Sequence, residues 1–207
     1  MNDKKKWLEW ARRIQAISQN GLEFAHNEYD IERNKKLADI AAEIISEHSN
    51  LDDESLVEIF LNQDGYATPK VDVRTAIIRD GKILLVKEIS DGKWSMPGGW
   101  ADVGDTPADA AVREAKEESG FNVNPVKVVG VYDANRGAGS LELFHAVKIV
   151  YLCEIIDGKA APSFETPEVA FFSLDDLPKL SENRTNERHI EHIKAHLKNP
   201  DTPTYFE

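Results

Sequence analysis

The sequence predicts an α/β (α+β) domain that follows a small, all-helical N-terminal domain. Apolar residues recur at helical spacing through the first 66 residues, and strand patterns broken by Asp-Gly turns begin after Pro69. A helix with well-marked ends then interrupts the strands. We therefore expect a helical domain over residues 1–66 and an α/β domain over residues 67–207.

Three helices are predicted in the N-terminal domain. Each shows apolar residues at helical spacing, and the third begins with acidic residues that suit a helix N-terminus. The expected ranges are Lys5–Ser18, Tyr29–Ser46 and Leu51–Gln63. The segment Tyr66–Pro69 is typical of a linker, so we expect the first domain to end there.

Strand patterns fill most of the second domain, and Asp80-Gly81 between the first two is a strong hairpin signal. The expected strands are Val71–Ile78, Lys82–Val86, Trp94–Met96, Val126–Tyr132, Phe144–Ile155 and Ala170–Phe172. Two helices are expected as well, at Pro107–Ser119 and Asn186–Leu197. Thr106 is the expected N-cap of the first of these, and Gly120 is expected to end it.

Composition excludes several classes of protein. The chain has 207 residues, of which 41% are hydrophobic, so a mostly disordered chain is excluded. Its net charge of −12 disfavours non-specific binding to nucleic acids or anionic membranes. The one cysteine, Cys153, excludes a disulfide framework and a cysteine zinc cluster. No segment approaches the ~20 apolar residues of a membrane span, and we expect a soluble, cytoplasmic protein.

The helix at Pro107–Ser119 carries the candidate site. At about 100° per residue, Glu114, Glu117 and Glu118 lie on one face. The simplest interpretation is a solvated acidic face. The alternative is a site for Mg²⁺ or Mn²⁺, because clustered carboxylates bind hard cations. The bound cations would in turn let an acidic protein hold a negatively charged phosphate compound. The turn Gly98-Gly99 precedes this helix and would allow close approach of its backbone.

Around this helix the sequence resembles the Nudix box, G-x5-E-x7-R-E-U-x-E-E-x-G-U, in which U is a bulky apolar residue. The matches at the required spacing are Gly99, Arg113, Glu114, Glu117, Glu118, Gly120 and Phe121. Two positions depart from the pattern. Asp105 replaces a glutamate and shortens an acidic arm, and Ala115 occupies an apolar position that is usually bulky.

The first 66 residues resemble, more loosely, the helical N-terminal domain of one Nudix subgroup. The similarity is carried by Gln19–Leu22, Tyr29–Arg33 and Ala41–Ile45. That subgroup hydrolyses nucleoside diphosphates linked to another moiety, and its members resemble CDP-choline or ADP-ribose pyrophosphatases. The resemblance implies a homodimer, with the N-terminal domain helping to build the interface and support the substrate.

The Nudix resemblance implies a mixed-sheet α/β/α sandwich and an attack of water on a pyrophosphate. It implies Glu114, Glu117 and Glu118 as metal ligands together with the backbone carbonyl of Gly98. Arg113 is implied to orient a carboxylate of the box. Two or more Mg²⁺ or Mn²⁺ ions per site would neutralise the diphosphate. The general base stays open among Glu118 and two later residues, Glu165 and Glu168.

Four further residues are candidates for substrate binding. Arg136 lies in a glycine-containing loop and could clamp a phosphate, or it could be a solvated loop residue. Arg184 is a weaker candidate of the same kind. Trp94 and Trp100 flank the Gly-Gly turn, and each could stack on a base or pack in the core.

Several functions fit these observations. The favoured one is hydrolysis of CDP-choline to CMP and phosphocholine. Hydrolysis of ADP-ribose or a nucleotide sugar is the alternative with the same chemistry. A non-catalytic, nucleotide-binding regulator is the alternative of another class, and the intact glutamate set argues against it. Action on RNA ends is disfavoured by the acidic charge, although metals could still serve a single strand.

Overall fold

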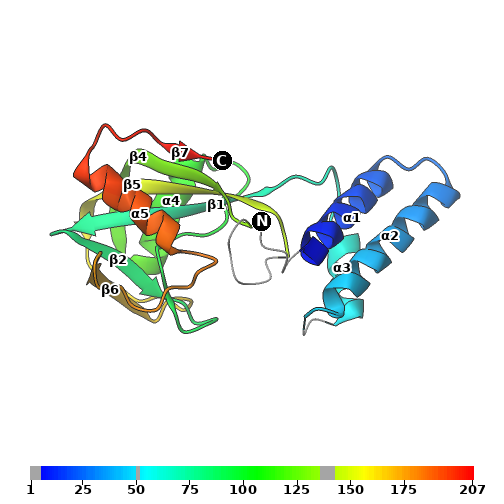
Figure 1. Ribbon diagram of the computed structural model, residues 1–207, viewed down its shortest axis with the longest axis horizontal. Helices are drawn as coiled ribbons and strands as arrows, with labels where there is room; N and C mark the ends of the chain where they lie inside the picture. The colour runs from blue at the N-terminus through cyan, green and yellow to red at the C-terminus, as the bar shows by residue number, and fades with distance from the viewer. Residues whose placement is uncertain (1–5, 50–51, 136–142) are drawn as a thin grey trace. The chain divides into compact units, whose positions relative to one another are not determined.

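The computed structural model describes residues 6–49, 52–135 and 143–207, and it separates into two compact units (Figure 1). The first unit contains the described residues up to Pro69 together with residues 143–145. The second contains the described residues from Lys70 onward, apart from that short segment. Of the predicted site residues, Arg136 lies outside the described part of the chain.

The first unit is made of three helices, α1 (Lys6–Glu23), α2 (Glu28–Ser46) and α3 (Asp53–Leu61). Helix α1 extends further than its pattern predicts, because it continues through Gly21. A Cβ atom on Gly21 would lie 2.1 Å from Oδ1 of Asn34 in α2, so the glycine permits a close approach of the two helices. The helix therefore tolerates a residue that usually weakens helices, since packing outweighs propensity.

An apolar core joins these three helices. Its buried members are Leu8, Ala11, Ala41, Ala42, Ile45, Leu56 and Phe60. Leu143 packs against this core from a distant part of the sequence, and its carbonyl accepts a hydrogen bond from Nε of Arg12 at 3.3 Å. The first unit is thus a helical bundle that one segment of the later chain completes.

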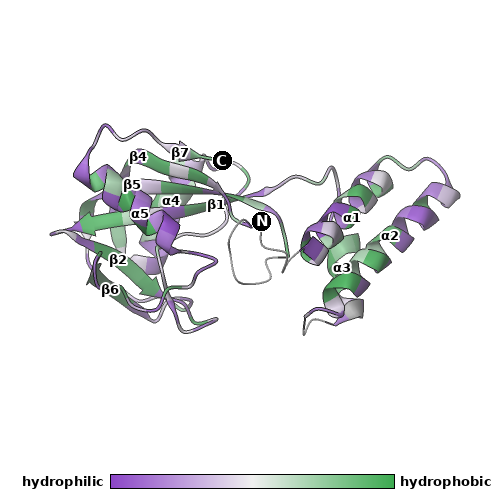
Figure 2. Ribbon diagram, in the orientation of Figure 1, coloured by the Kyte–Doolittle hydropathy of each residue, from purple (hydrophilic) through white to green (hydrophobic). Residues whose placement is uncertain are grey.

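The second unit contains a seven-stranded mixed sheet with the order β3-β2-β1-β5-β4-β7, and β6 pairs with β2. Its strands are β1 (Lys70–Arg79), β2 (Lys82–Lys87), β3 (Trp94–Ser95), β4 (Phe121–Asp133), β5 (Ala146–Gly158), β6 (Glu168–Ser173) and β7 (Tyr205–Phe206). Strand β1 runs parallel to β5, and β4 runs parallel to β7, whereas the other pairs are antiparallel. Figure 2 shows the apolar character of the central strands.

The strands predicted from local sequence patterns agree well with those of the structure, with two exceptions. The hairpin at Asp80-Gly81 is confirmed, because both residues have the positive φ angles, 52° and 72°, that a type I′ turn requires. Strand β4 begins earlier than predicted, directly after Gly120, and irregular register on both sides of Pro125 accommodates that proline. Strand β7 was not predicted, because two residues are too short for a periodic pattern.

Two helices cover opposite faces of this sheet (Figure 1). They are α4 (Pro107–Ser119) and α5 (Glu187–Lys198). Ala115 of α4 packs in one core cluster with Ile77 of β1. Ile193 of α5 packs in another cluster with Ala76, the neighbouring residue of β1. Adjacent residues of a strand point to opposite faces, so the α/β/α sandwich that the resemblance implied is confirmed.

Two further observations concern the single cysteine and the possibility of a membrane span. Cys153 is buried and its thiol is free. Across the described residues, none of the helices combines the length and the apolar character needed to cross a membrane.

Candidate active site

A glycine loop runs beside the first half of β1 and replaces β2 as its neighbour there. The amide of Val73 donates to the carbonyl of Gly99 at 2.8 Å, and that of Thr75 donates to the carbonyl of Pro97 at 2.9 Å. Gly98 has a φ of +146°, and a Cβ atom on it would lie 1.9 Å from the carbonyl oxygen of Val73. Only glycine fits this position. The backbone hydrogen bonds hold the loop against the strand, and Gly98 permits the close approach that they require.

Helix α4 begins with the predicted capping box. The hydroxyl of Thr106 accepts a hydrogen bond from the amide of Asp109 at 3.2 Å, and the carboxylate of Asp109 accepts one from the amide of Thr106 at 3.3 Å. Gly120 ends the helix with a φ of 80°. These signals set where the helix starts and stops, and hence which side chains face the glycine loop.

The three glutamates of α4 have different surroundings. Glu118 is 8% exposed, and its Oε2 accepts a hydrogen bond from the amide of Gly98 at 2.8 Å. The side chain of Glu114 is 14% exposed, whereas that of Glu117 is 59% exposed. A Cβ atom on Gly99 would lie 3.1 Å from the carboxyl group of Glu114. The glycine loop therefore leaves room for two carboxylates beside its backbone.

Arg113 connects four carboxylates around this site. Its Nη1 donates to Glu114 at 2.8 Å and to Glu117 at 3.3 Å. Its Nε lies 3.3 Å from a carboxylate oxygen of Asp105, and its Nη2 lies 3.4 Å from one of Asp102. Asp105 reaches Arg113 although it replaces the longer glutamate of the Nudix pattern. The guanidinium thus contacts two glutamates of α4 and joins this helix to the preceding loop.

Burial changes the acidity of two of these glutamates. It raises the pKa of Glu118 to about 7, against the opposing effects of the Arg74 guanidinium and the Gly98 amide. It also raises the pKa of Glu114, against the hydrogen bond and charge of Arg113. Neighbouring carboxylates with perturbed pKa values are typical of functional sites.

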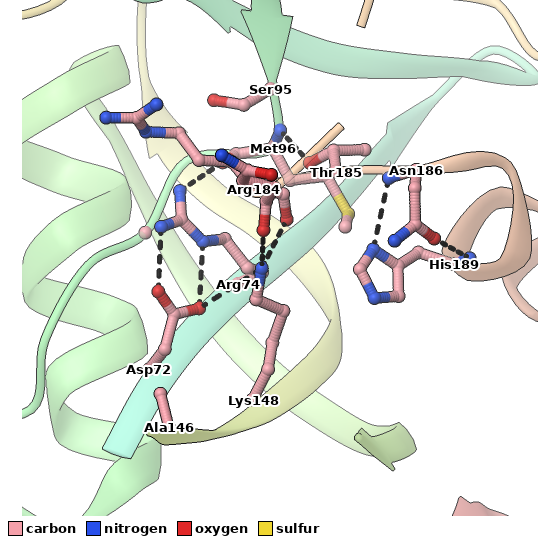
Figure 3. Close-up of polar contacts among 12 residues, drawn as sticks. Asp72, Arg74, Ser95, Met96, Ala146, Lys148, Arg184, Thr185, Asn186 and His189 are labelled. Atoms are coloured by element: carbon pink, nitrogen blue, oxygen red, sulfur yellow. Dashed lines mark hydrogen bonds and ion pairs between the residues drawn. The ribbon is translucent and has the colours of Figure 1, made fainter. Parts of the chain in front are cut away.

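A buried charged network lies behind the glycine loop, and the sequence pattern alone did not single it out (Figure 3). Arg74 is 5% exposed, and its Nε and Nη2 donate to the two carboxylate oxygens of Asp72 at 3.0 and 2.9 Å. The ammonium of Lys148 lies 3.9 Å from Asp72. Charged residues at alternate positions of the apolar run Val71–Ile78 were the available signal, because such positions share one face of a strand.

Glu88 is a second residue that the pattern did not reveal. It is 7% exposed, and its Oε1 accepts a hydrogen bond from the hydroxyl of Ser95 at 2.5 Å. Nε of Arg184 lies 3.2 Å from the same oxygen. Glu88 also contributes to the raised pKa of Glu118, so the two carboxylates are close enough to interact electrostatically. Arg184, a candidate for substrate binding, is thereby connected to the glutamate site through Glu88.

The two tryptophan candidates differ in their surroundings. The ring of Trp94 packs edge-on against Phe172, with 4.7 Å between the centroids, and belongs to the core that α5 covers. Trp100 is 44% exposed. Core packing explains the position of Trp94, whereas the ring of Trp100 has surface available to a ligand.

The two later glutamates are also in unlike positions. Glu168 lies on β6, and its carboxylate pairs with the ammonium of Lys87 at 2.7 Å. Glu165 is exposed in the loop before β6. The hydroxyl of Thr166 donates to the carbonyl of Glu118 at 2.8 Å, so this loop is fastened to the end of α4.

The donor set of the site suits a hard divalent cation. Glu118 is a buried carboxylate with a raised pKa, and a bound cation would favour its charged form. Within the described ranges, no three carboxylate, histidine or cysteine side chains are arranged so that they could already hold a metal ion. Arg113 holds Glu114 and Glu117 instead, so a cation would have to compete with its guanidinium.

Two family models match the chain. The model of the NUDIX domain matches residues 69–193, and the model described as a UDP-X-like, N-terminal oligomerisation domain matches residues 5–60. The sheet, the glycine loop and the glutamate-bearing helix agree with the first match. The chain belongs to the NUDIX family.

The relatives cover between two thirds and nearly all of the chain. YjhB of Bacillus subtilis (strain 168), provisionally named an ADP-ribose pyrophosphatase, is 39% identical over 98% of this chain and 97% of its own length. The crystal structure of a UDP-X diphosphatase is 32% identical, covers 98% of both chains and has a TM-score of 0.63. That of an ADP-ribose pyrophosphatase from Streptococcus suis 89-1591 is 37% identical, covers 68% of this chain and all of its own, and has a TM-score of 0.62.

These similarities confirm the predicted family and enzyme class. The chain is a Nudix hydrolase, an enzyme that acts on phosphorus-containing acid anhydrides. The family generally uses divalent metal ions. The role of each residue at the site, and the identity of the substrate, are proposals.

Proposed function

We propose that the protein hydrolyses the diphosphate of a nucleoside diphosphate linked to another moiety. The observation that carries the proposal is the buried carboxylate of Glu118, held by the amide of Gly98 on the same helix as Glu114 and Glu117. This arrangement supports the proposal because a carboxylate, a group that suits a hard cation, lies directly beside a glycine backbone that a phosphate can approach.

ADP-ribose is the first substrate to test. Two relatives, YjhB and the Streptococcus suis protein, carry names that refer to it, and they are 39% and 37% identical to this chain. The UDP-X diphosphatase structure supports a UDP-linked compound as the second choice. CDP-choline, which the sequence favoured, stays a prediction. The diphosphate chemistry is the same for all three compounds, so the glutamate site does not distinguish between them.

Mg²⁺ or Mn²⁺ would be held by Glu114, Glu117, Glu118 and the carbonyl of Gly98, with two or more ions per site. A bound cation of this kind neutralises the diphosphate and makes it easier to attack. Arg113 orients the carboxylates of Glu114 and Glu117 in this scheme. Arg184 contacts the diphosphate in this scheme, and the phosphate-clamping role of Arg136 stays a prediction from the sequence.

We assign Glu165 as the general base in preference to Glu168, because Glu168 is paired with Lys87. Glu165 directly precedes Thr166, whose hydroxyl donates to the carbonyl of Glu118, and this supports a position for Glu165 close to the end of α4. The variant E165Q should lower kcat about a hundredfold, a loss typical of a removed general base. A comparable loss in E168Q, with E165Q active, would contradict this assignment.

A hydrolysis panel tests the proposed function. The substrates are ADP-ribose, UDP-N-acetylglucosamine, CDP-choline, ATP and a short 5′-capped RNA, each with Mg²⁺ and with Mn²⁺. We expect turnover of the linked nucleoside diphosphates and release of a nucleoside monophosphate. Turnover of ATP or RNA alone would refute the proposed substrate class. Tight binding without turnover would favour a nucleotide-binding regulator.

We also propose that the chain forms a homodimer through its helical unit. The model matched by residues 5–60 describes an oligomerisation domain. Large apolar side chains are exposed on α1 and α2, among them Trp10, Ile17, Tyr29 and Ile40. Light scattering after size exclusion should give the mass of two chains. The variant I17E should shift this mass toward one chain, and a monomeric wild type would refute the proposal.

A further inference from the structure

Lys148 is a buried lysine in β5, with only 2% of its surface exposed. It lies opposite Asp72 of β1 in the parallel pair, and its Nζ is 3.9 Å from the carboxylate of Asp72. The same Nζ donates hydrogen bonds to the carbonyls of Asn183 and Arg184, the latter at 2.9 Å (Figure 3). A buried ammonium is stable only when such partners replace its water, so these contacts account for its burial.

The segment that Lys148 binds is anchored on both sides. The amide of Ser181 donates to the carbonyl of Trp94 at 2.8 Å. The amide of Met96 donates to the hydroxyl of Thr185 at 2.8 Å. Between these two anchors the backbone forms neither a helix nor a strand, and its carbonyls turn inward to the ammonium. Two turn hydrogen bonds, from the amides of Arg184 and Thr185 to the carbonyl of Ser181 at 2.8 and 2.7 Å, shape this segment. Lys148 adds a contact from β5 that ties the turn to the sheet.

The side chain of Arg184 leaves this segment on the side of the glutamate site. Its Nε lies 3.2 Å from Oε1 of Glu88, and Glu88 interacts electrostatically with Glu118. The Arg184 side chain is 33% exposed, so part of its guanidinium is available to a ligand. A planar guanidinium with several N–H donors matches the geometry of phosphate oxygens.

We propose that Lys148 is a positioning residue of the active site. Its ammonium fixes the backbone of Arg184 and thereby presents the Arg184 guanidinium to the diphosphate of the substrate. Asp72 and Arg74 support this role. Ion pairs link Lys148 to Asp72 and Asp72 to Arg74, and Nη1 of Arg74 donates to the carbonyl of Met96 at 3.4 Å, two residues before Gly98. The inference rests on the proposed function, in which Arg184 contacts the diphosphate.

The test compares two lysines with similar contacts. Lys127 also donates to two backbone carbonyls, those of Pro200 and Thr202, at 2.5 and 2.7 Å, but in the segment before β7. K148M should raise KM for the linked nucleoside diphosphate about tenfold with little change in kcat, as expected for a displaced charged hydrogen bond. K127M should leave both constants near those of the wild type. If K148M does not fold, K148Q takes its place.

A double-mutant cycle separates positioning from a general structural effect. In the R184A background, K148M should change KM less than about twofold, because the group that it positions is absent. K148R, which restores the charge and the donors, should recover part of the loss. Equal effects of K148M with and without Arg184 would overturn the inference.

A second readout does not depend on the substrate. The affinity for imidodiphosphate with Mg²⁺, measured by calorimetry, should fall in K148M and in R184A but not in K127M. If no member of the panel is hydrolysed, the proposed function fails, while this affinity still measures the coupling of Lys148 and Arg184. The same affinity in R184A and the wild type would overturn the inference.

Discussion

Replacing Glu118 by glutamine should stabilise the cation-free protein while it abolishes activity. Glu118 is 8% exposed, and burial raises its pKa from the ordinary 4.5 to about 7. The E118Q side chain has nearly the same shape, and its amide oxygen can still accept the hydrogen bond from Gly98. The variant therefore removes the charge and keeps the packing.

The size of the effect follows from the pKa. Because the carboxyl group ionises more readily in the unfolded chain, the wild type loses stability as the pH rises from 4.5 through about 7. One pKa unit corresponds to about 1.4 kcal/mol, so the full loss is about 3 kcal/mol. E118Q lacks this loss. Its advantage in the free energy of unfolding should be close to zero below pH 4.5 and should reach about 3 kcal/mol near pH 8.

Urea denaturation in EDTA, followed by circular dichroism from pH 4 to pH 8, measures this difference. Mg²⁺ should then stabilise the wild type more than E118Q, because a cation that binds the folded state adds to its stability. In a separate assay with Mg²⁺, kcat of E118Q should collapse. An E118Q protein that is less stable than the wild type at pH 8, or an advantage that does not change with pH, would refute the reasoning.

Three further changes test other parts of the site. G98A should lower Tm strongly, because its Cβ would lie 1.9 Å from the carbonyl of Val73, whereas G104A, with positive φ but open space, should cost only about 1 kcal/mol. R113K should lower kcat about tenfold with an unchanged circular dichroism spectrum, since one ammonium cannot replace the forked guanidinium contacts to several carboxylates. Cys153 should not react with a thiol reagent at pH 8 until urea is added, because burial raises its pKa to about 12.

The parts of the site that the sequence predicted depend on local chemistry. The capping box at Thr106 and the left-handed Gly120 set the ends of α4, and the spacing along the helix puts the three glutamates on one side. The close approach of Gly98 to β1 agrees with the role expected of the Gly-Gly turn. Each of these features depends on residues within a few positions of one another.

Other features depend on residues that are distant in the sequence. Lys148 is 76 residues from Asp72 along the chain, and only the parallel pairing of β1 and β5 brings them together. Glu88 meets Arg184 through a segment with no regular secondary structure. The same glutamate pattern also gave no indication that Glu118 would be buried and Glu117 exposed.

The glycine turn and the glutamate helix of the Nudix box could thus be predicted from the sequence, because helix caps and turns form from groups that are neighbours along the chain. The folded chain added the unequal burial of Glu114, Glu117 and Glu118 and the buried charges behind them. Burial and long-range ion pairs arise only when the sheet assembles, since they depend on which strands lie side by side.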